Sequence, residues 1–425
     1  MRLLLIADMA QTGFGRVGRE LGRGLMERGW DVRVIGVNWR GIGGEVAAAE
    51  RHSIERAREV FDEASADPLT PHIVPATAGG DGMGYALTAP AIRGRLWTGW
   101  TPERVLLVAD PRAALDRLAQ DEGACATVPT WNYVPIEGTG LPPFWRAIWR
   151  IVEPVTMTAF GQAQVEELLG RPVEMVPHGV STPFYPVAAD RPGTWKGQPV
   201  TSKAGAKEAL GWAGRTVLLR TDRFVPRKNT AALLRSMTPV LAAHPEVMLA
   251  LHCATMDEGG ILDELISRVP GAFETGPGRW SHPQIIATRA HDTFRGLSDG
   301  DLNVLYNAAD IYTSTTMAEG FGLCLAEALA AGVPVVTTDY AAGPEVCGPG
   351  AVTVPVTGYI TNVYAHEWAL VDEPAFTAAV EHLVTHPAAR AELSAAGRRH
   401  VARYTWDAAA DAFDSILRTA PAKAA

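Results

Sequence analysis

The chain has 425 residues, of which 47% are hydrophobic and 20% are charged, and its formal net charge is −9. This composition predicts a soluble globular protein with a large core, long enough for two domains. The negative balance gives no bulk attraction to nucleic acid or to an anionic membrane, so a nucleic acid partner is disfavoured without being excluded. No apolar run reaches the roughly twenty residues of a membrane span, so we expect no transmembrane segment.

The cysteines and the first residues indicate the compartment. Cys125, Cys253, Cys324 and Cys347 lie far apart and form no C-x-x-C pair. This spacing is typical of a reducing compartment and argues against a zinc site. The first apolar stretch is too short for a secretory signal and is interrupted by Asp8. We therefore expect a cytoplasmic protein.

Short apolar strands alternate with helical stretches, which is the pattern of parallel α/β sheets. In the first half, strands are predicted at 2–7, 31–39, 104–110, 125–131 and 155–160, with a helix at 16–29. In the second half, strands are predicted at 216–222, 247–253, 310–316 and 333–339, and helices at 229–245, 302–310 and 322–332. A last amphipathic helix is predicted at 405–420.

Composition also indicates where the two halves meet. Residues 181–199 are rich in proline and glycine and lack helical periodicity, as linkers do. We therefore predict an α/β fold of two doubly wound, Rossmann-like domains, residues 1–180 and 215–400, joined by a linker region at 181–214. Ligands bind such sheets at the carboxyl ends of the strands, so both domains should face a central cleft.

The stretch GFGRVG follows the first predicted strand and fits G-x-G-x-x-G at Gly13, Gly15 and Gly18. In a strand-to-helix context this is the fingerprint of a dinucleotide-binding loop. An NAD enzyme usually has an acidic residue at the end of its second strand, whereas this strand ends in Asn38-Trp39-Arg40. Arg40 could meet the phosphate of NADP, so an NADP-dependent oxidoreductase stays open as an alternative.

The stretch AEGFGLCLAEAL places two carboxylates around a glycine turn. Glu319 is predicted at the end of a strand, Gly320 to Gly322 in a tight turn, and Glu327 early in the following helix. The free amides at that helix start would point towards an anion, and the carboxylates can accept hydrogen bonds from a sugar or a ribose. Alternatively, Glu327 complements the helix dipole and Glu319 is a solvated loop residue.

Two cations are predicted at the same edge of the second sheet. Arg223 and Lys228 follow a strand and precede a helix. Fixed cations there can hold a diphosphate and stabilise the charge that develops as it leaves. The alternative is two surface cations in a loop, but their position beside the Glu319 loop favours a shared site.

These motifs, in this order, resemble the retaining glycosyltransferases of family 4, which have the two-domain GT-B fold. Glu319 and Glu327 are similar to the E-x7-E motif of that family, and Arg223 and Lys228 to its Arg/Lys pair. The stretch EMVPHGVSTPFYP is similar to the segment that enters the interdomain linker, with His178 where asparagine is common. Residues 401–425 resemble the closing helix that packs back on the N-terminal domain.

The resemblance implies roles for these residues. Residues 1–180 would bind the acceptor and residues 215–400 the nucleotide-sugar. Arg223 and Lys228 would neutralise the leaving diphosphate, and Glu319 would act on the transferred sugar, so these are the expected catalytic residues. The expected donor-binding residues are Gly13, Gly15, Gly320, Phe321, Gly322, Leu323 and Glu327, with Glu327 on the ribose hydroxyls. Gly18 is expected to let its helix pack closely on the sheet.

The acceptor side departs from the family pattern. Many members have a histidine after the strand that matches the stretch 125–138, and this chain has none there. Asp110 and Glu137 are the acceptor-side candidates. The acceptor itself stays open among small molecules, lipids, glycans, proteins and modified nucleic acid bases.

Two further patterns have a structural alternative. The stretch SDGD mimics a D-x-D metal motif but directly precedes a helix, where Ser298 or Asp299 would serve as a cap. We therefore expect neither a metal ion nor another cofactor. Trp145 and Trp149 share one helix face, which allows a weak peripheral membrane contact but favours packing on the first domain.

The sequence therefore predicts a retaining, hexosyltransferase-like enzyme. It would move a sugar from a UDP- or GDP-linked donor to a hydroxyl acceptor without a metal ion. A non-catalytic sugar-nucleotide-binding protein of the same fold is a further hypothesis, beside the NADP-dependent oxidoreductase.

Overall fold

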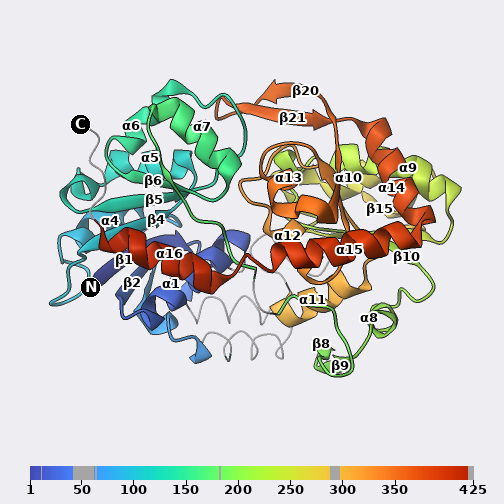
Figure 1. Cartoon of the computed structure of the whole chain (residues 1–425), viewed down its shortest axis with the longest axis horizontal. Helices are drawn as coiled ribbons and strands as arrows, with labels where there is room; N and C mark the ends of the chain where they lie inside the picture. Colours follow the sequence, from blue (N-terminus) through green and yellow to red (C-terminus); the bar gives the residue numbers. More distant parts are fainter. Residues whose placement is uncertain (11, 42–61, 63–64, 181–182, 288–296, 420–425) are drawn as a thin grey trace.

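The computed structural model describes residues 1–10, 12–41, 62, 65–180, 183–287 and 297–419. Two parallel sheets form the cores of two lobes that lie side by side (Figure 1). The predicted α/β architecture of two doubly wound, Rossmann-like domains is therefore confirmed. Each lobe is described below only as far as it positions the cleft between them.

The first sheet is parallel throughout, with strand order β3-β2-β1-β4-β5-β6-β7. Its strands are β1 (Arg2–Asp8), β2 (Asp31–Val37), β3 (Ile73–Pro75), β4 (Arg104–Val108), β5 (Thr130–Val134), β6 (Glu153–Thr156) and β7 (Glu174–Met175). Its α-helices are α1 (Gly13–Glu27), α4 (Tyr85–Ile92), α5 (Pro111–Gln120), α6 (Arg146–Trp149) and α7 (Ala159–Leu169). The order reverses between β1 and β4, so a ligand crevice is expected at their carboxyl ends.

The second sheet is also parallel, with order β16-β11-β10-β17-β18-β19. Its strands are β10 (Thr216–Thr221), β11 (Val247–His252), β16 (Ile285–Ala287), β17 (Ile311–Ser314), β18 (Val335–Thr338) and β19 (Ala351–Val354). Its α-helices are α9 (Thr230–Ala243), α10 (Leu262–Ile266), α11 (Asp299–Ala308), α12 (Leu323–Ala330), α13 (Ala342–Cys347), α14 (Glu373–Thr385) and α15 (Pro387–Val401). The order reverses between β10 and β17, which places a second crevice after these strands.

Small antiparallel hairpins lie outside the two main sheets. They are β8 (Gly193–Trp195) with β9 (Gln198–Val200), β12 (Met256–Asp257) with β13 (Gly260–Ile261), β14 (Phe273–Gly276) with β15 (Arg279–Ser281), and β20 (Val356–Thr361) with β21 (Glu367–Val371). The β20–β21 hairpin extends from the second lobe towards the first (Figure 1).

The apolar runs of the strands form because both faces of each sheet are covered. In β1, Leu3 and Leu5 pack into one apolar cluster, and Leu4 and Ile6 pack into another on the opposite face. A strand buried on both sides needs apolar residues at successive positions instead of an alternating pattern. This is why the central strands of both sheets could be located from the sequence, whereas β3, β7, β16 and β19 were not predicted.

The predicted linker region, 181–214, contains regular structure in its described part. It holds β8, β9 and α8 (Lys203–Ala209), which pack against the second lobe. The backbone N–H of Lys196 donates to Asp301 at 3.0 Å, and the Lys203 ammonium donates to the Ala309 carbonyl at 2.6 Å. The described part of this segment therefore packs on the second lobe, whereas its composition indicated only a linker.

The last helix, α16 (Trp406–Arg418), packs on α1 of the first lobe, although it follows the second in sequence (Figure 1). Arg28 donates to Asp411 at 2.8 Å, and the Trp30 indole donates to Asp414 at 2.7 Å. The chain end thus connects the two lobes a second time.

Several predicted strands differ from the structure in their limits, and two of them differ most. The strand expected at 125–131 begins only at Thr130, because the preceding residues form a 3₁₀ turn, Ala124–Thr127. The strand expected at 155–160 ends at Thr156. There the Thr158 hydroxyl accepts a hydrogen bond from the Gly161 N–H at 3.2 Å and starts α7.

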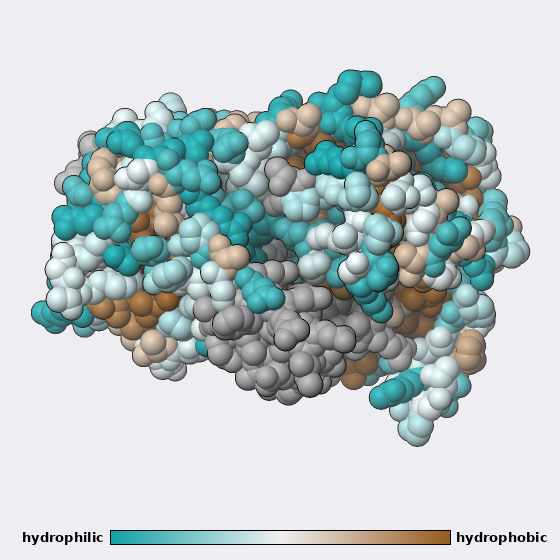
Figure 2. Space-filling model, turned by 90° about the horizontal axis from the view of Figure 1, so that it is seen from below, coloured by the Kyte–Doolittle hydropathy of each residue, from teal (hydrophilic) through white to brown (hydrophobic). Residues whose placement is uncertain are grey.

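The tryptophans considered for a membrane contact are buried. Trp145 and Trp149 are 6% and 2% exposed and pack within the first lobe, so the packing interpretation is confirmed for both. On the face shown in Figure 2, hydrophilic residues cover most of the described surface and apolar ones occur in small groups. Among the described helices, none has the length and apolar character to cross a bilayer.

Candidate active site

A cleft of about 740 Å³ lies between the lobes and is lined by residues of both. From the first lobe come the end of β1, the start of α1, and the loops after β4 and β5. From the second lobe come the loops after β10 and β17 and the start of α12. Apart from the loop after β5, these segments lie at the carboxyl ends of the strands between which each sheet reverses its order. The cleft is therefore where a doubly wound fold binds its ligand.

One carboxylate of the second lobe is held between two cations. Glu319 accepts from the Lys228 ammonium at 2.6 Å and from the Arg227 guanidinium at 3.0 Å. Arg227 also reaches Glu137 of the first lobe, with 2.9 Å between Nη2 and Oε1. Although burial opposes its ionisation, the charges of Lys228 and Arg227 lower the pKa of Glu319 to about 2. Glu319 is therefore ionised at neutral pH.

Arg223 lies on the same side of the cleft but faces other carboxylates. Its guanidinium donates to Asp257 at 2.9 Å and to Glu258 at 3.0 Å. Arg223 and Lys228 both line the cleft, so the structure brings together the pair that the sequence singled out. Arg227, which lies between them in the chain, joins them there.

Glu327 lies in α12 and is 2% exposed. The Tyr306 hydroxyl donates to it at 2.8 Å, and Arg16 of the first lobe forms an ion pair with it. Arg16 also pairs with Asp299 at the start of α11, and its guanidinium lies 5.1 Å from the centre of the Phe184 ring. Burial raises the pKa of Glu327, against the effect of the Arg16 charge. Glu327 thus interacts with residues of both lobes, Tyr306 of the second and Arg16 of the first.

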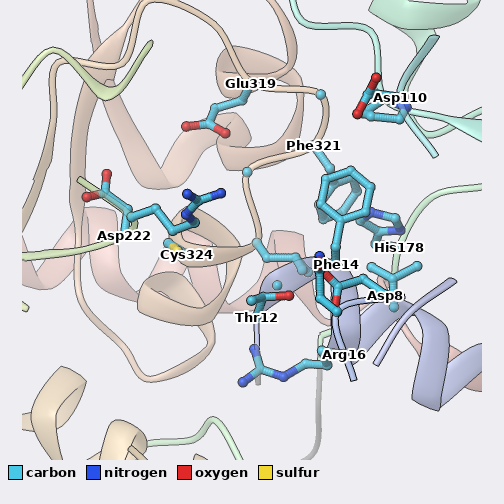
Figure 3. Close-up of a pocket in the computed structure, with 18 of the residues that line it drawn as sticks. Asp8, Thr12, Phe14, Arg16, Asp110, His178, Asp222, Glu319, Phe321 and Cys324 are labelled. Carbon is cyan, nitrogen blue, oxygen red and sulfur yellow. The ribbon is translucent and has the colours of Figure 1, made fainter. Parts of the chain in front are cut away.

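The glycine turn before α12 lies against the first lobe. A Cβ at Gly320 would be 2.5 Å from Cβ of Pro135, so only glycine fits there. Gly322 has φ of 92° and is the N-cap of α12. Between them, the Phe321 ring packs on His178 with ring centres 4.8 Å apart (Figure 3). Leu323, the first residue of α12, lines the cleft.

The start of α1 faces the start of α12 across the cleft. A Cβ at Gly13 would lie 3.6 Å from the Leu323 side chain, which is ordinary contact. Gly15 differs from its expected role, because it is buried and does not line the cleft. A Cβ there would be 1.8 Å from the Ala10 carbonyl oxygen, so this glycine is required for packing. At Gly18 the Cβ would be 2.7 Å from the Asp8 carbonyl oxygen, which agrees with close packing on the sheet.

The acceptor-side candidates line the first lobe's part of the cleft (Figure 3 labels Asp110). Asp110 is the N-cap of α5 and accepts from the Ala113 N–H at 2.9 Å, and Glu137 pairs with Arg227. Burial raises the pKa of both carboxyl groups. Asp110 therefore has a structural role as well as a position at the cleft.

Several cleft residues carried no predicted role. They are Asp8, Arg16, Arg227, Tyr364 and His366, all of which line the cleft. For Asp8, Arg16 and Arg227, a usable signal was their position at the end of β1, near the start of α1 and beside Lys228, respectively. No local pattern marked the last two, which come from the β20–β21 hairpin. His291 and Asp292, to which the sequence assigns no definite role, lie outside the described residues.

His178 was noted for replacing a common asparagine, and the structure places it, almost fully buried, in the lining of the cleft. Its Nδ1 lies 2.8 Å from the Tyr133 hydroxyl. Burial lowers its pKa to about 3, so the imidazole is neutral. Its ring packs against the Phe321 ring of the glycine turn. The helix cap expected at SDGD is confirmed at Ser298, whose hydroxyl accepts from the Asp301 N–H at 3.1 Å.

Two doubly wound lobes facing a shared cleft define the GT-B class of glycosyltransferase folds, and solved structures agree. Anabaena Alr3699/HepE, solved in complex with UDP and glucose, matches with a TM-score of 0.65 and 14% identity over 98% of this chain and 99% of that chain. Sucrose-phosphate synthase from Thermosynechococcus elongatus matches with a TM-score of 0.60 and 16% identity over 98% of each chain. At these identities the likeness concerns the fold.

The sequence comparisons indicate the same class of protein. Residues 288–400 match the model of "Glycosyl transferases group 1", and the resemblance inferred from the motifs is confirmed. A D-inositol 3-phosphate glycosyltransferase of Saccharomonospora viridis is 30% identical over 52% of this chain and 47% of its own length.

Mannosyltransferases are also similar to this chain. A GDP-mannose-dependent monoacylated α-(1-6)-phosphatidylinositol monomannoside mannosyltransferase of Corynebacterium glutamicum is 27% identical over 52% of this chain and 51% of its own length. A GDP-mannose-dependent α-(1-6)-phosphatidylinositol monomannoside mannosyltransferase of Mycolicibacterium smegmatis is 26% identical over 70% of this chain and 71% of its own length. The chain thus spans about half the length of the first of these relatives and of the inositol phosphate enzyme.

Proposed function

We propose that the protein is a retaining glycosyltransferase that moves a sugar from a nucleotide diphosphate-sugar to a hydroxyl acceptor. The observation that carries the proposal is the pairing of two buried carboxylates with cations on opposite sides of one turn. Glu319 is held by Lys228 and Arg227, and Glu327 by Tyr306 and Arg16. The NADP-dependent oxidoreductase is not favoured, since the family and the fold both indicate glycosyltransferases.

The chemistry of these side chains supports the following arrangement of the donor. Glu327 accepts hydrogen bonds from the ribose hydroxyls, in place of those it now receives. Lys228, Arg227 and Arg223 face the diphosphate, with the amides at the start of α12, and Glu319 and its turn hold the sugar. Fixed positive charge of this kind supplies what a metal ion supplies elsewhere, so we propose a metal-independent reaction.

The chemical step needs no separate general base. The acceptor oxygen forms its bond to the anomeric carbon on the face from which the diphosphate oxygen leaves. The acceptor proton passes to the departing phosphate oxygen, which gains the electron pair of the broken bond. Positioning of the two substrates and stabilisation of the developing negative charge supply the rate enhancement.

Nucleotide binding tests the proposal most directly. The thermal unfolding of the wild type is measured with UDP, GDP, ADP and NADPH, with GDP first because two relatives are named as GDP-mannose-dependent. A nucleoside diphosphate is expected to raise the melting temperature of the wild type. Glu327→Ala is expected to abolish this increase, because the ribose loses its acceptor.

The matched control is Glu392→Gln, at an exposed position of α15, which is expected to respond to the nucleotide as the wild type does. A stabilisation by NADPH alone that Glu327→Ala leaves unchanged contradicts the proposal. Once the donor is identified, the anomeric configuration of the product, read by NMR, tests retention.

A further inference from the structure

Arg220, the penultimate residue of β10, is an arginine enclosed by the second lobe, with 2% exposure. Its Nε donates to the Asp222 carboxylate at 2.8 Å, and its Nη1 donates to the Thr315 hydroxyl at 3.2 Å. Its Nη2 donates to the backbone carbonyl of Lys228. One guanidinium therefore joins the end of β10, the loop after β17 and the turn that carries Lys228.

The turn that carries Lys228 is held through its backbone. It is the 3₁₀ turn Pro226–Lys228, and the next residue, Asn229, has φ of 51°, in the left-handed region. The Thr315 hydroxyl donates to the Asn229 carbonyl at 2.9 Å. Two successive carbonyls of this segment, those of Lys228 and Asn229, are thus fixed by the buried side chains of Arg220 and Thr315.

The backbone of Lys228 determines where its ammonium lies. This ammonium donates to Glu319 at 2.6 Å, and Lys228 is only 9% exposed, so its side chain has little room to compensate for a shift of the turn. Fixed charges stabilise an anion best when they are held in position before it arrives. Arg220 is therefore placed to control the position of this cation without contacting a ligand itself.

The charge of Arg220 is matched by a neighbouring carboxylate. Among the described residues that line the cleft is Asp222, labelled in Figure 3, but not Arg220. Because the two side chains form an ion pair, they present little net charge to an anion in the cleft. Any effect of Arg220 on a bound diphosphate is therefore expected to pass through Lys228.

We propose that Arg220 is a positioning residue of the donor site, which holds the Lys228 carbonyl and thereby fixes the Lys228 ammonium on the diphosphate. The inference rests on the proposed function, in which Glu327 binds the ribose and Glu319 the sugar. Since Lys228 contacts Glu319, its ammonium faces the phosphate that carries the sugar. A nucleoside monophosphate lacks this second phosphate, so its binding does not depend on Arg220.

The ratio of diphosphate to monophosphate affinity tests the proposal. Binding of GDP and GMP, with UDP and UMP in parallel, is measured by isothermal titration calorimetry on the full chain. Arg220→Lys keeps the positive charge beside Asp222, but its single nitrogen lacks the planar fork that reaches three partners. We expect it to weaken diphosphate binding about tenfold, as for one lost charge-assisted hydrogen bond, and to leave monophosphate binding unchanged.

The matched control is Arg235→Lys on α9, where the arginine forms an exposed ion pair with Glu373. This variant is expected to bind all four nucleotides as the wild type does. A merely structural defect in Arg220→Lys would lower the affinities for diphosphate and monophosphate alike, because it would reduce the fraction of folded protein.

Two more variants show whether Arg220 acts through Lys228. In a Lys228→Met background, which has no ammonium to position, Arg220→Lys is expected to weaken diphosphate binding no further. Thr315→Val keeps Arg220 but releases the Asn229 carbonyl and one guanidinium contact. It is expected to weaken diphosphate binding selectively as well, and it tests the proposal even if Arg220→Lys does not fold.

A diphosphate-to-monophosphate ratio that is unchanged in Arg220→Lys, or in Thr315→Val, overturns the proposal, as does an additive loss in the Lys228→Met background. If Glu327→Ala abolishes diphosphate binding while Arg220→Lys leaves it unchanged, only this inference fails. A wild type that binds neither GDP nor UDP refutes the proposed function itself, and this inference with it.

Discussion

At the scale of single residues, the cleft concentrates charge that the fold keeps out of water. The ion pairs of Glu319 and Glu327 are almost fully buried, and each includes a residue from beyond its own loop. Charge in such surroundings interacts strongly, because solvent screens it little. The two carboxylates nevertheless respond to burial differently, since cations hold Glu319 ionised while burial raises the pKa of Glu327.

Glu319 makes stability depend on pH in a defined window. Its pKa falls from an ordinary value of 4.5 to about 2 on folding, so its ionised form stabilises the folded state fully above pH 4.5. This contribution is lost as the pH falls towards 2. We expect the free energy of unfolding of Glu319→Gln, measured by urea denaturation, to fall below that of the wild type most at neutral pH and to approach it near pH 2. A difference that is independent of pH would contradict this assignment.

At the scale of elements, the starts of α1 and α12 decide the shape of the cleft. The G-x-G-x-x-G stretch lies within α1, whose N-cap is Thr12. Its glycines therefore serve different purposes, since Gly13 borders the cleft while Gly15 and Gly18 pack on the preceding loop and strand.

A pair of alanine substitutions tests this division. Gly15→Ala places a methyl group 1.8 Å from the Ala10 carbonyl oxygen, and we expect it to destabilise the protein by about 3 kcal/mol. Gly13→Ala meets only Leu323 at 3.6 Å and should leave stability nearly unchanged. Thermal and urea unfolding of both variants provide the measurement. Equal stabilities would show that α1 starts differently from the arrangement described.

At the scale of the whole molecule, contacts across the cleft hold the lobes together. Arg16 connects α1 to Glu327 and Asp299, Arg227 connects the second lobe to Glu137, and α16 returns to the first lobe. Donor binding to Glu327 would have to exchange the Arg16 ion pair for ribose hydroxyls.

Removal of the Arg16 guanidinium leaves a buried carboxylate without its cation. We expect Arg16→Ala to lower the free energy of unfolding by about 3 kcal/mol in the absence of nucleotide. The control is Arg235→Ala, which breaks an exposed ion pair with Glu373 and should cost less than about 1 kcal/mol. Urea denaturation of both variants distinguishes them, and a similar small loss in each would rule out a stabilising interdomain contact at Arg16.

The sequence by itself determined the α/β class, the two doubly wound sheets and the likeness to group 1 glycosyltransferases. Parallel strands that are buried on both faces are continuous apolar runs, so they can be recognised in the sequence. Residues that follow such strands lie at the same edge of the sheet, so they can be grouped before any side-chain position is known. This is why Arg223, Lys228, Glu319 and Glu327 could be grouped from the chain alone, although their individual roles stay predictions.

Only the tertiary structure decided which partners these residues meet. Arg16 contacts Glu327, which lies 311 positions away in the chain, and His366 contacts Glu137, which lies 229 positions away. No local sequence pattern indicates such long-range pairs. Gly15 matched a ligand-binding pattern, yet the carbonyl oxygen of Ala10 lies where its side chain would be. Local patterns specify elements, whereas contacts between distant segments depend on how those elements pack.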